Sequence, residues 1–280
     1  MSIPLALTIA GSDPGGGAGI QADLKTFAAH GVYGVSAITA VTAQNTTGVM
    51  RAEPMQADLV TAQLEAVMSD FGAHAAKTGM LANAAIVEAV AAAAQDLELP
   101  YLVVDPVIVS SSGDLLLDDE GVLALKKELL RRAHAVTPNI PEAELLSGVS
   151  IRSEQDRREA ARRLFALGPV HVVITGGHTP QAWNQPSAGI SDLIVDLVYD
   201  GEVFTEYTSE RIAARHTHGT GCAFSAGIAA HLALGRSLHE AVPLVQAYVA
   251  GAIRHAPRLG AGSGPINHFW RLDSDRAGRL

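Results

Sequence analysis

The sequence HTHGTGC occupies residues 216–222 and leads directly into the apolar, alanine-rich run AFSAGIAA at residues 223–230. Glycines and small residues before such a run predict a tight loop that opens onto the N-terminus of a buried helix. The first N–H groups of a helix lack internal partners and carry the positive end of its dipole. The loop is therefore suited to bind an anion, and phosphate is the most common biological anion.

Cys222, the single cysteine of the chain, stands at the start of that predicted helix. A helix N-terminus lowers the pKa of a thiol, which would make this cysteine reactive. The alternative is that Gly219 and Gly221 only form a turn and that Cys222 is a small buried hydrophobic residue, as free cysteines often are. The loop alone does not decide between the two, so the rest of the chain must.

The composition narrows the class of protein. The 280 residues, 48% of them hydrophobic, suffice for a sizeable core in one large or two smaller domains. The net charge of −9 comes without any long block of lysine and arginine, so we expect no nucleic-acid partner. A single cysteine suits a reducing compartment. No signal peptide and no membrane span are evident, and we expect a cytoplasmic protein.

Short apolar runs alternate with segments of helical periodicity along the chain. The runs expected to be strands lie at residues 5–10, 35–41, 75–81, 101–104, 135–137 and 171–175. Helices are expected at residues 20–30, 58–71, 83–97, 118–132, 153–167 and 238–254, with another beginning at Pro141. This alternation predicts an α/β fold, with a doubly wound, mostly parallel sheet and helices on both faces.

Three further segments complete the predicted organisation. Asp200-Gly201, between apolar runs at 192–199 and 202–207, is typical of a small β-hairpin. Residues 179–191 are rich in loop-forming residues and are expected to form a flexible flap. We expect one domain over residues 1–272 and a disordered tail at 273–280.

Polar residues follow the ends of most predicted strands. Each could belong to an ordinary turn, but parallel strands place their carboxyl ends along one edge of the sheet, where ligands bind. Together these residues favour a binding site there. Acidic residues without a cysteine or histidine cluster indicate a hard cation such as Mg²⁺ rather than zinc. The residues at these strand ends include Gly11, Gln44, Lys77, Asp105, Asn139 and Gly177.

Other classes of enzyme are less well supported. Residues 17–22 match the loose dinucleotide pattern G-x-G-x-x-A, but no acidic residue ends the second predicted strand. No Walker sequence and no serine-hydrolase elbow occur. His216 and His218 lack a third ligand at metal spacing, which favours a loop role for both. A cysteine–histidine pair of Cys222 with His218 is disfavoured, because nearness in sequence is its sole support.

Six segments, in the right order, resemble bacterial hydroxymethylpyrimidine/phosphomethylpyrimidine kinases over about residues 5–270. They are residues 11–26, 42–46, 77–81, 105–107, 137–144 and 217–222. The resemblance implies a ribokinase-like fold, MgATP as phosphoryl donor, a role in thiamine biosynthesis and a homodimer. The implied substrates are 4-amino-5-hydroxymethyl-2-methylpyrimidine and its monophosphate, which is converted to the diphosphate.

The resemblance also implies residue roles. Gln44 would hydrogen-bond the amino group and a ring nitrogen of the pyrimidine. The same pocket would be lined by Gly11, Asp23, Met80 and Val107. The ATP phosphates would contact Asp105, Asn139, Thr175 and Gly177, with Glu142 at the Mg²⁺. The anion hole would comprise Gly219, Thr220, Gly221 and Cys222, with Cys222 where related sugar and pyridoxal kinases carry an aspartate base.

Two departures from the family pattern affect the phosphate side. Thr175 and Ser111 stand where the family usually carries lysines that would offset phosphate charge. The second phosphorylation, on an anionic substrate, is the step most affected, and Arg215 or Lys77 could compensate. One alternative is a pyridoxal/pyridoxine kinase, since that activity shares the fold and Cys222 does not exclude it. Another is a non-catalytic pyrimidine-binding protein on a kinase scaffold, which the missing lysines support. Gln44 favours the pyrimidine.

Overall fold

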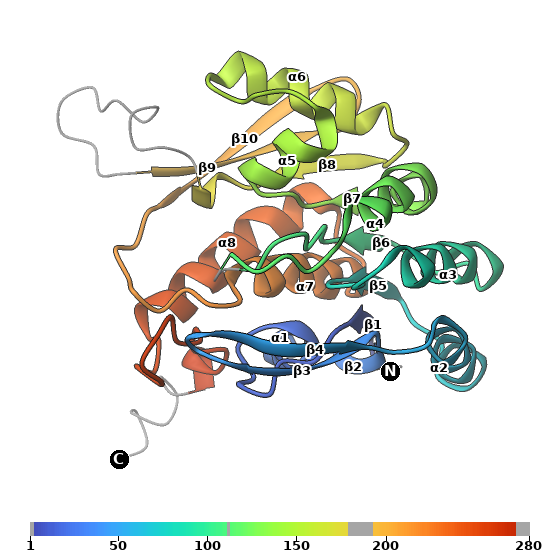
Figure 1. The fold of residues 1–280 in the computed structure, drawn as a ribbon. Coiled ribbons are helices and arrows are strands. Elements are labelled where there is room, and N and C mark those ends of the chain that lie inside the picture. Colours follow the sequence, from blue (N-terminus) through green and yellow to red (C-terminus); the bar gives the residue numbers. More distant parts are fainter. Residues whose placement is uncertain (1–2, 111–112, 179–192, 273–280) are drawn as a thin grey trace, which may run out of the picture.

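A computed structural model describes residues 3–110, 113–178 and 193–272. At its centre is an eight-stranded sheet with the order β10-β9-β8-β7-β6-β5-β1-β2 (Figure 1). Strands β1, β2 and β5 to β8 are parallel, whereas β9 runs antiparallel to both of its neighbours. The strands are β1 Leu5–Ala10, β2 Tyr33–Ile38, β5 Ala75–Thr78, β6 Leu102–Val104, β7 Ala135–Val136, β8 His171–Ile174, β9 Leu193–Tyr199 and β10 Phe204–Glu210.

Helices cover both faces of this sheet, which confirms the predicted doubly wound α/β fold. They are α1 Gly19–Ala29, α2 Ala57–Asp70, α3 Ala84–Asp96, α4 Asp119–Ala124, α5 Ile140–Ser147, α6 Glu154–Phe165, α7 Thr220–Ala233 and α8 Leu238–Arg254. One buried cluster joins the sheet to α2 through α6, and a second joins it to α1, α7 and α8. Successive side chains of β1 point to opposite faces of the sheet, so Leu7 packs in the first cluster and Ala6 in the second.

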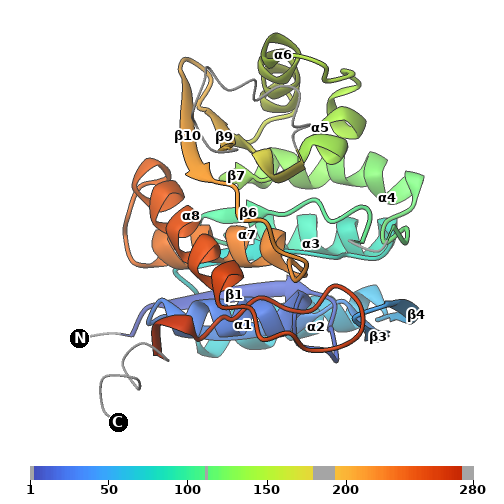
Figure 2. The ribbon, with the colours of Figure 1, turned by 90° about the vertical axis from the view of Figure 1, so that its left-hand side faces the viewer.

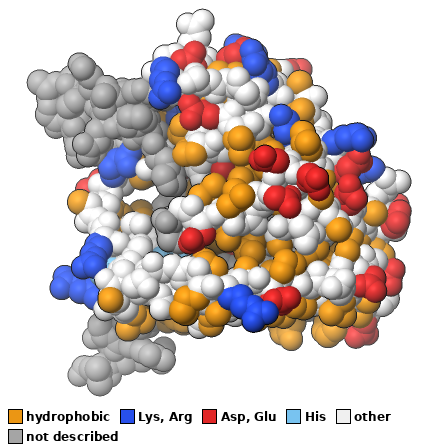
Figure 3. Space-filling model, in the orientation of Figure 1, with side chains coloured by type: hydrophobic (Ala, Val, Ile, Leu, Met, Phe, Trp, Pro, Cys, Tyr) orange, Lys and Arg blue, Asp and Glu red, His pale blue; other side chains and the backbone are white. Residues whose placement is uncertain are grey.

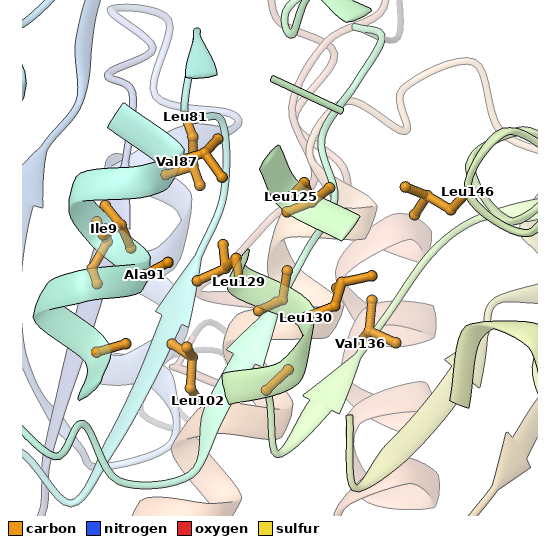
Figure 4. Close-up of a cluster of buried hydrophobic side chains, with 14 of the residues drawn as sticks. Ile9, Leu81, Val87, Ala91, Leu102, Leu125, Leu129, Leu130, Val136 and Leu146 are labelled. Atoms are coloured by element: carbon orange, nitrogen blue, oxygen red, sulfur yellow. The ribbon is translucent and has the colours of Figure 1, made fainter. Parts of the chain in front are cut away.

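The larger cluster is shown in Figure 4. Ile9 and Leu102 come from the sheet and Val87 from α3, and Leu129 and Leu130 lie on the helical turns that follow α4. All five side chains are at most 1% exposed. Continuous apolar strands of this kind suit a parallel sheet that is buried on both faces.

The structure corrects the prediction for residues 35–41. Strand β2 ends at Ile38, and the chain turns into a separate two-stranded sheet of β3 (Ala40–Asn45) and β4 (Gly48–Pro54). Thr39 redirects the chain, because its N–H donates to the carbonyl of Ala10 and its hydroxyl to the carbonyl of Met80. The β3–β4 hairpin, drawn in blue in Figures 1 and 2, projects beside the end of β1.

Other predicted elements are confirmed with small changes. The Asp200-Gly201 turn joins β9 and β10, and the Asp200 carboxylate accepts hydrogen bonds from the N–H groups of Glu202 and Val203. Residues 118–132 form α4 followed by a π-helical turn, Leu125–Leu129, and a short 3₁₀ turn, Leu130–Arg132, rather than one helix. Asn83 caps α3 as expected, accepting from the N–H of Ile86. Ser111, the predicted flap at 179–191 and the predicted tail at 273–280 lie outside the described residues.

The surface agrees with the acidic composition. Acidic side chains are scattered over the side of the molecule formed by α3 and α4 in Figure 3, and lysines and arginines are dispersed among them. Within the described residues, no helix is both long enough and apolar enough to span a bilayer.

Candidate active site

The direction of strand addition reverses between β1 and β5. From β1 the chain moves outward to β2, and from β5 it moves the opposite way through β6, β7 and β8. At such a switch point the loops after neighbouring strands diverge and leave a crevice. The first glycine loop, residues 11–18, follows β1 here, and the anion loop, residues 217–222, leads into α7 next to it.

The anion loop depends on one glycine. Gly219 caps α7 in a left-handed conformation with φ of 83°. A Cβ atom at this position would also overlap the carbonyl oxygen of Gly17. Backbone sterics and this close approach together demand glycine. The N-terminus of α7 is thereby packed directly against the first glycine loop.

Asp13 and His218 hold the two loops together. The Asp13 carboxylate accepts from the N–H groups of Gly15 (2.8 Å), Gly17 (3.1 Å) and Ala18 (2.9 Å), and lies 2.9 Å from His218 Nε2. Burial opposes ionisation of Asp13, but these hydrogen bonds outweigh it and lower the pKa of the carboxyl. The contact agrees with the predicted loop role of His218.

His216 also has a loop role, since its Nδ1 accepts from the N–H of Gly264 at 3.0 Å. Across residues 3–110, 113–178 and 193–272, no three His, Cys, Asp or Glu side chains are grouped so as to hold a metal ion. His218 in the anion loop and His216 just before it thus hold the loop to neighbouring segments.

A buried ionic network lies beneath the anion loop. The Lys77 ammonium contacts both oxygens of Asp23, at 3.0 and 2.9 Å, and lies 3.9 Å from Asp105 Oδ2. Thr8 donates to Asp23 at 2.6 Å. Burial alone would lower the pKa of Lys77, but the charges of Asp23 and Asp105 outweigh it and raise that pKa. Lys77 is therefore charged.

Two expectations change as a result. Asp23 was expected to line the substrate pocket, but its side chain is fully buried, bonded to Thr8 and Lys77. Lys77 was one of two residues that could compensate for the missing family lysines, yet its side chain is also fully buried, and its ammonium faces carboxylates. In this structure the polar atoms of both side chains are directed to each other and to Thr8 and Asp105.

Asp105 and Glu142 form the acidic side of the crevice. Glu142 and Asn139 make a reciprocal capping box at the start of α5, with both bonds 3.0 Å long. Burial and the nearby charge of Asp105 raise the pKa of Glu142 to about 8. The Asp105 carboxylate accepts a 2.9 Å hydrogen bond from Ser225 of α7. Nothing in the sequence singled out Ser225, because the contact joins residues 120 positions apart.

Cys222 differs from the expected thiolate. Burial raises the pKa of this half-buried thiol to about 12, with Asp105 and Asp23 adding to the rise and Lys77 only partly offsetting it. The helix N-terminus does not overcome these effects, so the thiol is protonated at neutral pH. The expectation of a lowered pKa was wrong because the sequence could not show the buried carboxylates around it.

The residues expected to bind substrate fall into two adjoining groups. Gly11 donates its N–H to the carbonyl of Met80 at 3.2 Å, and a Cβ on Gly11 would lie 3.2 Å from Met80 Sδ. Half-buried Val107 follows Asp105 along the same edge. Gln44, at the end of β3, lines a cavity of about 400 Å³ that it shares with His218.

The residues expected to contact ATP phosphates lie farther along the edge. Thr175 forms a β-bridge with Asn139, and its N–H donates to the carbonyl of Pro138 at 2.9 Å. Arg211 donates to the carbonyl oxygen of Gly177 at 3.0 Å, placing a cation beside this segment. Sequence reasoning did not identify Arg211. Arg215, the other residue considered for compensation, donates to the carbonyl of Ala261 at 2.6 Å.

A doubly wound α/β sheet, a switch-point crevice and a glycine-bounded anion loop at a helix N-terminus define a phosphotransferase of the ribokinase-like class. A family model described as phosphomethylpyrimidine kinase matches residues 13–267. The chain belongs to this kinase family.

Individual relatives agree. The chain is 46% identical over 269 residues to the hydroxymethylpyrimidine/phosphomethylpyrimidine kinase of Bacillus subtilis, covering 96% of both chains. It is 48% identical over 270 residues to the thiamine biosynthesis bifunctional protein ThiED of Geobacter sulfurreducens, covering 96% of this chain and 53% of that protein. The solved ADP complex of Bacillus subtilis pyridoxal kinase superposes with a TM-score of 0.86 at 38% identity, covering 97% of this chain and 99% of that one.

Proposed function

We propose that the protein transfers the γ-phosphoryl group of ATP to 4-amino-5-hydroxymethyl-2-methylpyrimidine and then to the resulting monophosphate, as a step of thiamine biosynthesis. The observation that carries this proposal is the cavity that extends from Gln44 to His218, beside the anion loop. The Gln44 amide in this lining suits the amino-pyrimidine edge. The chain continues from His218 into the start of α7, whose backbone N–H groups suit a phosphoryl group. The name of the Bacillus subtilis relative supports the same substrates, and that of the Geobacter sulfurreducens relative supports a role in thiamine biosynthesis.

In this proposal each part of the crevice has one task. Gln44 orients the ring, with Gly11, Met80 and Val107 along its sides. The N–H groups of the anion loop, Gly219 to Cys222, stabilise the charge on the transferred phosphoryl group. Asn139, Thr175 and Gly177 adjoin the ATP phosphates, where Arg211 supplies positive charge in place of the missing lysines.

Mg²⁺ fits the acidic side of this crevice. Burial and, after it, the charge of Asp105 disfavour ionisation of Glu142, and a divalent cation would offset both effects. Mg²⁺ commonly binds one or two carboxylates and completes its shell with phosphate oxygens and water. Glu142 and Asp105 would hold the ion, which would neutralise charge on the ATP phosphates.

Pyridoxal is the second candidate substrate, because the pyridoxal kinase superposes over nearly the whole chain. A pyridine alcohol has the same reacting group as the pyrimidine alcohol, a primary hydroxymethyl on an aromatic ring. It lacks the amino group that pairs with a side-chain amide. We therefore expect pyridoxal to be a poorer substrate, and Gln44→Leu to reduce the turnover of the pyrimidine more than that of pyridoxal.

One experiment tests the proposed activity. Purified protein is incubated with MgATP and, separately, with the pyrimidine alcohol, its monophosphate and pyridoxal, and ADP and products are followed. We expect both pyrimidines to be phosphorylated. Binding of the pyrimidine without turnover of any substrate would instead support the non-catalytic binding protein.

We further propose that residues 1–272 form one domain and that the protein is a cytoplasmic homodimer. The continuous eight-stranded sheet supports the single domain. Light scattering after size-exclusion chromatography will give the mass in solution. Limited proteolysis will test the domain, and we expect cleavage within 179–191 or 273–280 rather than between sheet strands.

A further inference from the structure

The segment after α8 forms a C-terminal glycine loop, residues 259–265, with Gly260, Gly262 and Gly264. In Figure 2 this red segment runs across the molecule toward the blue β3–β4 hairpin. The proposed function gives this loop no role. Its contacts show that it is wedged between two parts of the site.

On one side the loop touches the hairpin turn, residues 45–48. The N–H of Gly262 donates to Thr46 Oγ1 at 3.1 Å. A Cβ atom on Gly262 would overlap the carbonyl oxygen of Thr46, and one on Gly260 would overlap the Thr46 side chain. Gly262 lacks the left-handed φ of Gly260, so alanine there would meet the hairpin turn without backbone strain of its own.

On its other side the loop touches the anion loop and the residues just before it. Arg215 donates to the carbonyl of Ala261 at 2.6 Å, and the N–H of Gly264 donates to His216 Nδ1 at 3.0 Å. The N–H of His218 donates in turn to the carbonyl of Gly264 at 3.2 Å. The C-terminal glycine loop therefore separates the hairpin turn from the anion loop.

The cavity that holds Gln44 and His218 lies at the same place. Its lining also includes the hairpin turn, Gly262 and Ser263, and its volume is about 400 Å³. Gln44 pairs with Val49 immediately before the turn, so a shift of the turn carries Gln44 with it. The contact of Gly262 with Thr46 therefore lies between the expected ring anchor and the expected phosphoryl site.

We propose that the Thr46–Gly262 contact is a specificity determinant, which sets how the enzyme divides its activity between the pyrimidine alcohol and the pyrimidine monophosphate. This inference rests on the proposed function and concerns the same site. Neither residue needs to touch the reacting atoms, since both act by placing Gln44.

The chemistry of the two steps explains why this distance matters. In the first step the alcohol oxygen bonds to the γ-phosphorus, the bond from that phosphorus to the ADP oxygen breaks, and the hydroxyl proton is released. In the second step an oxygen of the monophosphate forms the same bond, and ADP again leaves. The second substrate is longer by one phosphoryl group. If the γ-phosphorus is held at the same anion loop, the ring must lie nearer the hairpin turn in the second step.

Gly262→Ala tests the inference, because the added methyl pushes the turn away from the anion loop. We expect kcat/KM for the alcohol to fall at least about tenfold and that for the monophosphate to fall less, so that their ratio changes at least about fivefold. Thr46→Val, which removes the acceptor of the Gly262 N–H, should shift the ratio in the same direction by a smaller factor. Thr46→Ser keeps the acceptor and should retain the wild-type ratio.

Met50→Ala is the matched control, since Met50 lies on the same hairpin, is 71% exposed and does not line the cavity. The KM for ATP and the melting temperature are measured for every variant to separate misplacement of the ring from misfolding. A folded Gly262→Ala and a folded Thr46→Val that both keep the wild-type ratio within twofold would overturn the inference. Failure of the proposed function differs, because the wild-type protein would then phosphorylate neither pyrimidine.

Discussion

Titratable residues lie at both the carboxyl ends of the parallel strands, the carboxyl edge, and their amino ends, the amino edge, but they are of different kinds. At the carboxyl edge, Lys77 contacts Asp23 at 2.9 Å and lies within 3.9 Å of Asp105. At the amino edge, Tyr101, His134 and His171 form a row in which successive rings meet edge to face, with centroids 5.0 and 5.1 Å apart. Burial lowers the pKa of His134 and, together with the neighbouring histidines, lowers that of His171 to about 4.

The difference between the two edges distinguishes residues that suit ligand binding from residues that only pack. At the edge where phosphate is expected to bind, the Lys77 ammonium is charged and faces the carboxylates of Asp23 and Asp105, whereas burial raises the pKa of Glu142 to about 8. The histidines of the opposite edge are uncharged at neutral pH and contribute as aromatic rings. Burial of polar residues alone therefore does not distinguish the phosphate-binding edge from the opposite edge. The charge state of each buried residue does.

Removing the cation of the carboxyl edge should have the largest effect on stability. Lys77→Met leaves Asp23 buried without its partner, and we expect a loss of about 3–5 kcal/mol in the free energy of unfolding, measured with urea. Lys127→Met, at a side chain 78% exposed, should change it by less than about 0.5 kcal/mol. The double variant Lys77→Met/Asp23→Leu should recover part of the loss. A single variant as stable as wild type would show that this pair is not ionised.

Altering the anion loop should have the largest effect on catalysis. Gly219→Ala combines a left-handed backbone with an overlap at Gly17, and we expect kcat to fall about 100-fold or more. Gly235→Ala is the matched control, because Gly235 has a φ of 78° but open space around it. Comparable losses of kcat in both variants would mean that backbone strain, rather than the contact between the loops, limits activity.

Ser225 tests how the carboxyl edge holds α7. Ser225→Ala removes the donor to Asp105 from a fully buried position, and we expect the free energy of unfolding to fall by about 1–2 kcal/mol. The kcat should fall more than the KM for pyrimidine rises, because α7 carries the anion loop. Ser69→Ala, at an exposed hydroxyl bonded within its own helix, is the control. A change in stability alone would restrict Ser225 to a structural role.

Acid should reduce the stability that the amino edge contributes. The pKa of His171 is about 4 in the folded protein, below its ordinary value of 6.5. Stability from neutral His171 is therefore fully present above pH 6.5 and is lost as the pH falls from 6.5 toward 4. Because the ring is half-exposed, we expect about 1 kcal/mol from this residue. His171→Gln should flatten the pH dependence of urea unfolding in this window, and an unchanged slope would contradict the neutral histidine.

The sequence predicted the scaffold far better than the electrostatics. The strand at Leu5–Ala10 and the helix at Leu238–Arg254 were predicted to the residue, because apolar periodicity and caps are local signals. The β3–β4 hairpin was missed, because Thr39 turns the chain through hydrogen bonds to Ala10 and to Met80, 41 residues away. The alternation of apolar and polar side chains along the sequence cannot predict hydrogen bonds between such distant residues.

The same distinction applies to the site. Glycines and strand ends predicted the crevice, and the helix expected to begin at Pro141 begins one residue earlier, at Ile140. The partners of Asp23 and Asp105 lie 54 and 120 positions away, so no local pattern could show that Asp23 is covered or that Ser225 is bonded. Charge states in a buried network depend on these distant partners, which is why Cys222 was misjudged.

Cys222 should show the smallest effect. With a pKa near 12, the thiol is protonated throughout the neutral range and is a poor acceptor for the proton of the substrate alcohol. We therefore expect Cys222→Ala to reduce kcat by only about three- to tenfold, through lost packing, and to leave the pH profile of kcat between pH 6 and 9 unchanged. Cys222→Ser, which keeps a polar group of similar size, should lose less. A thousandfold loss in both variants, with disappearance of an ionisation from the wild-type profile, would show that bound substrate lowers the thiol pKa. The carboxyl edge would then contain a base as well as charges held in fixed pairs.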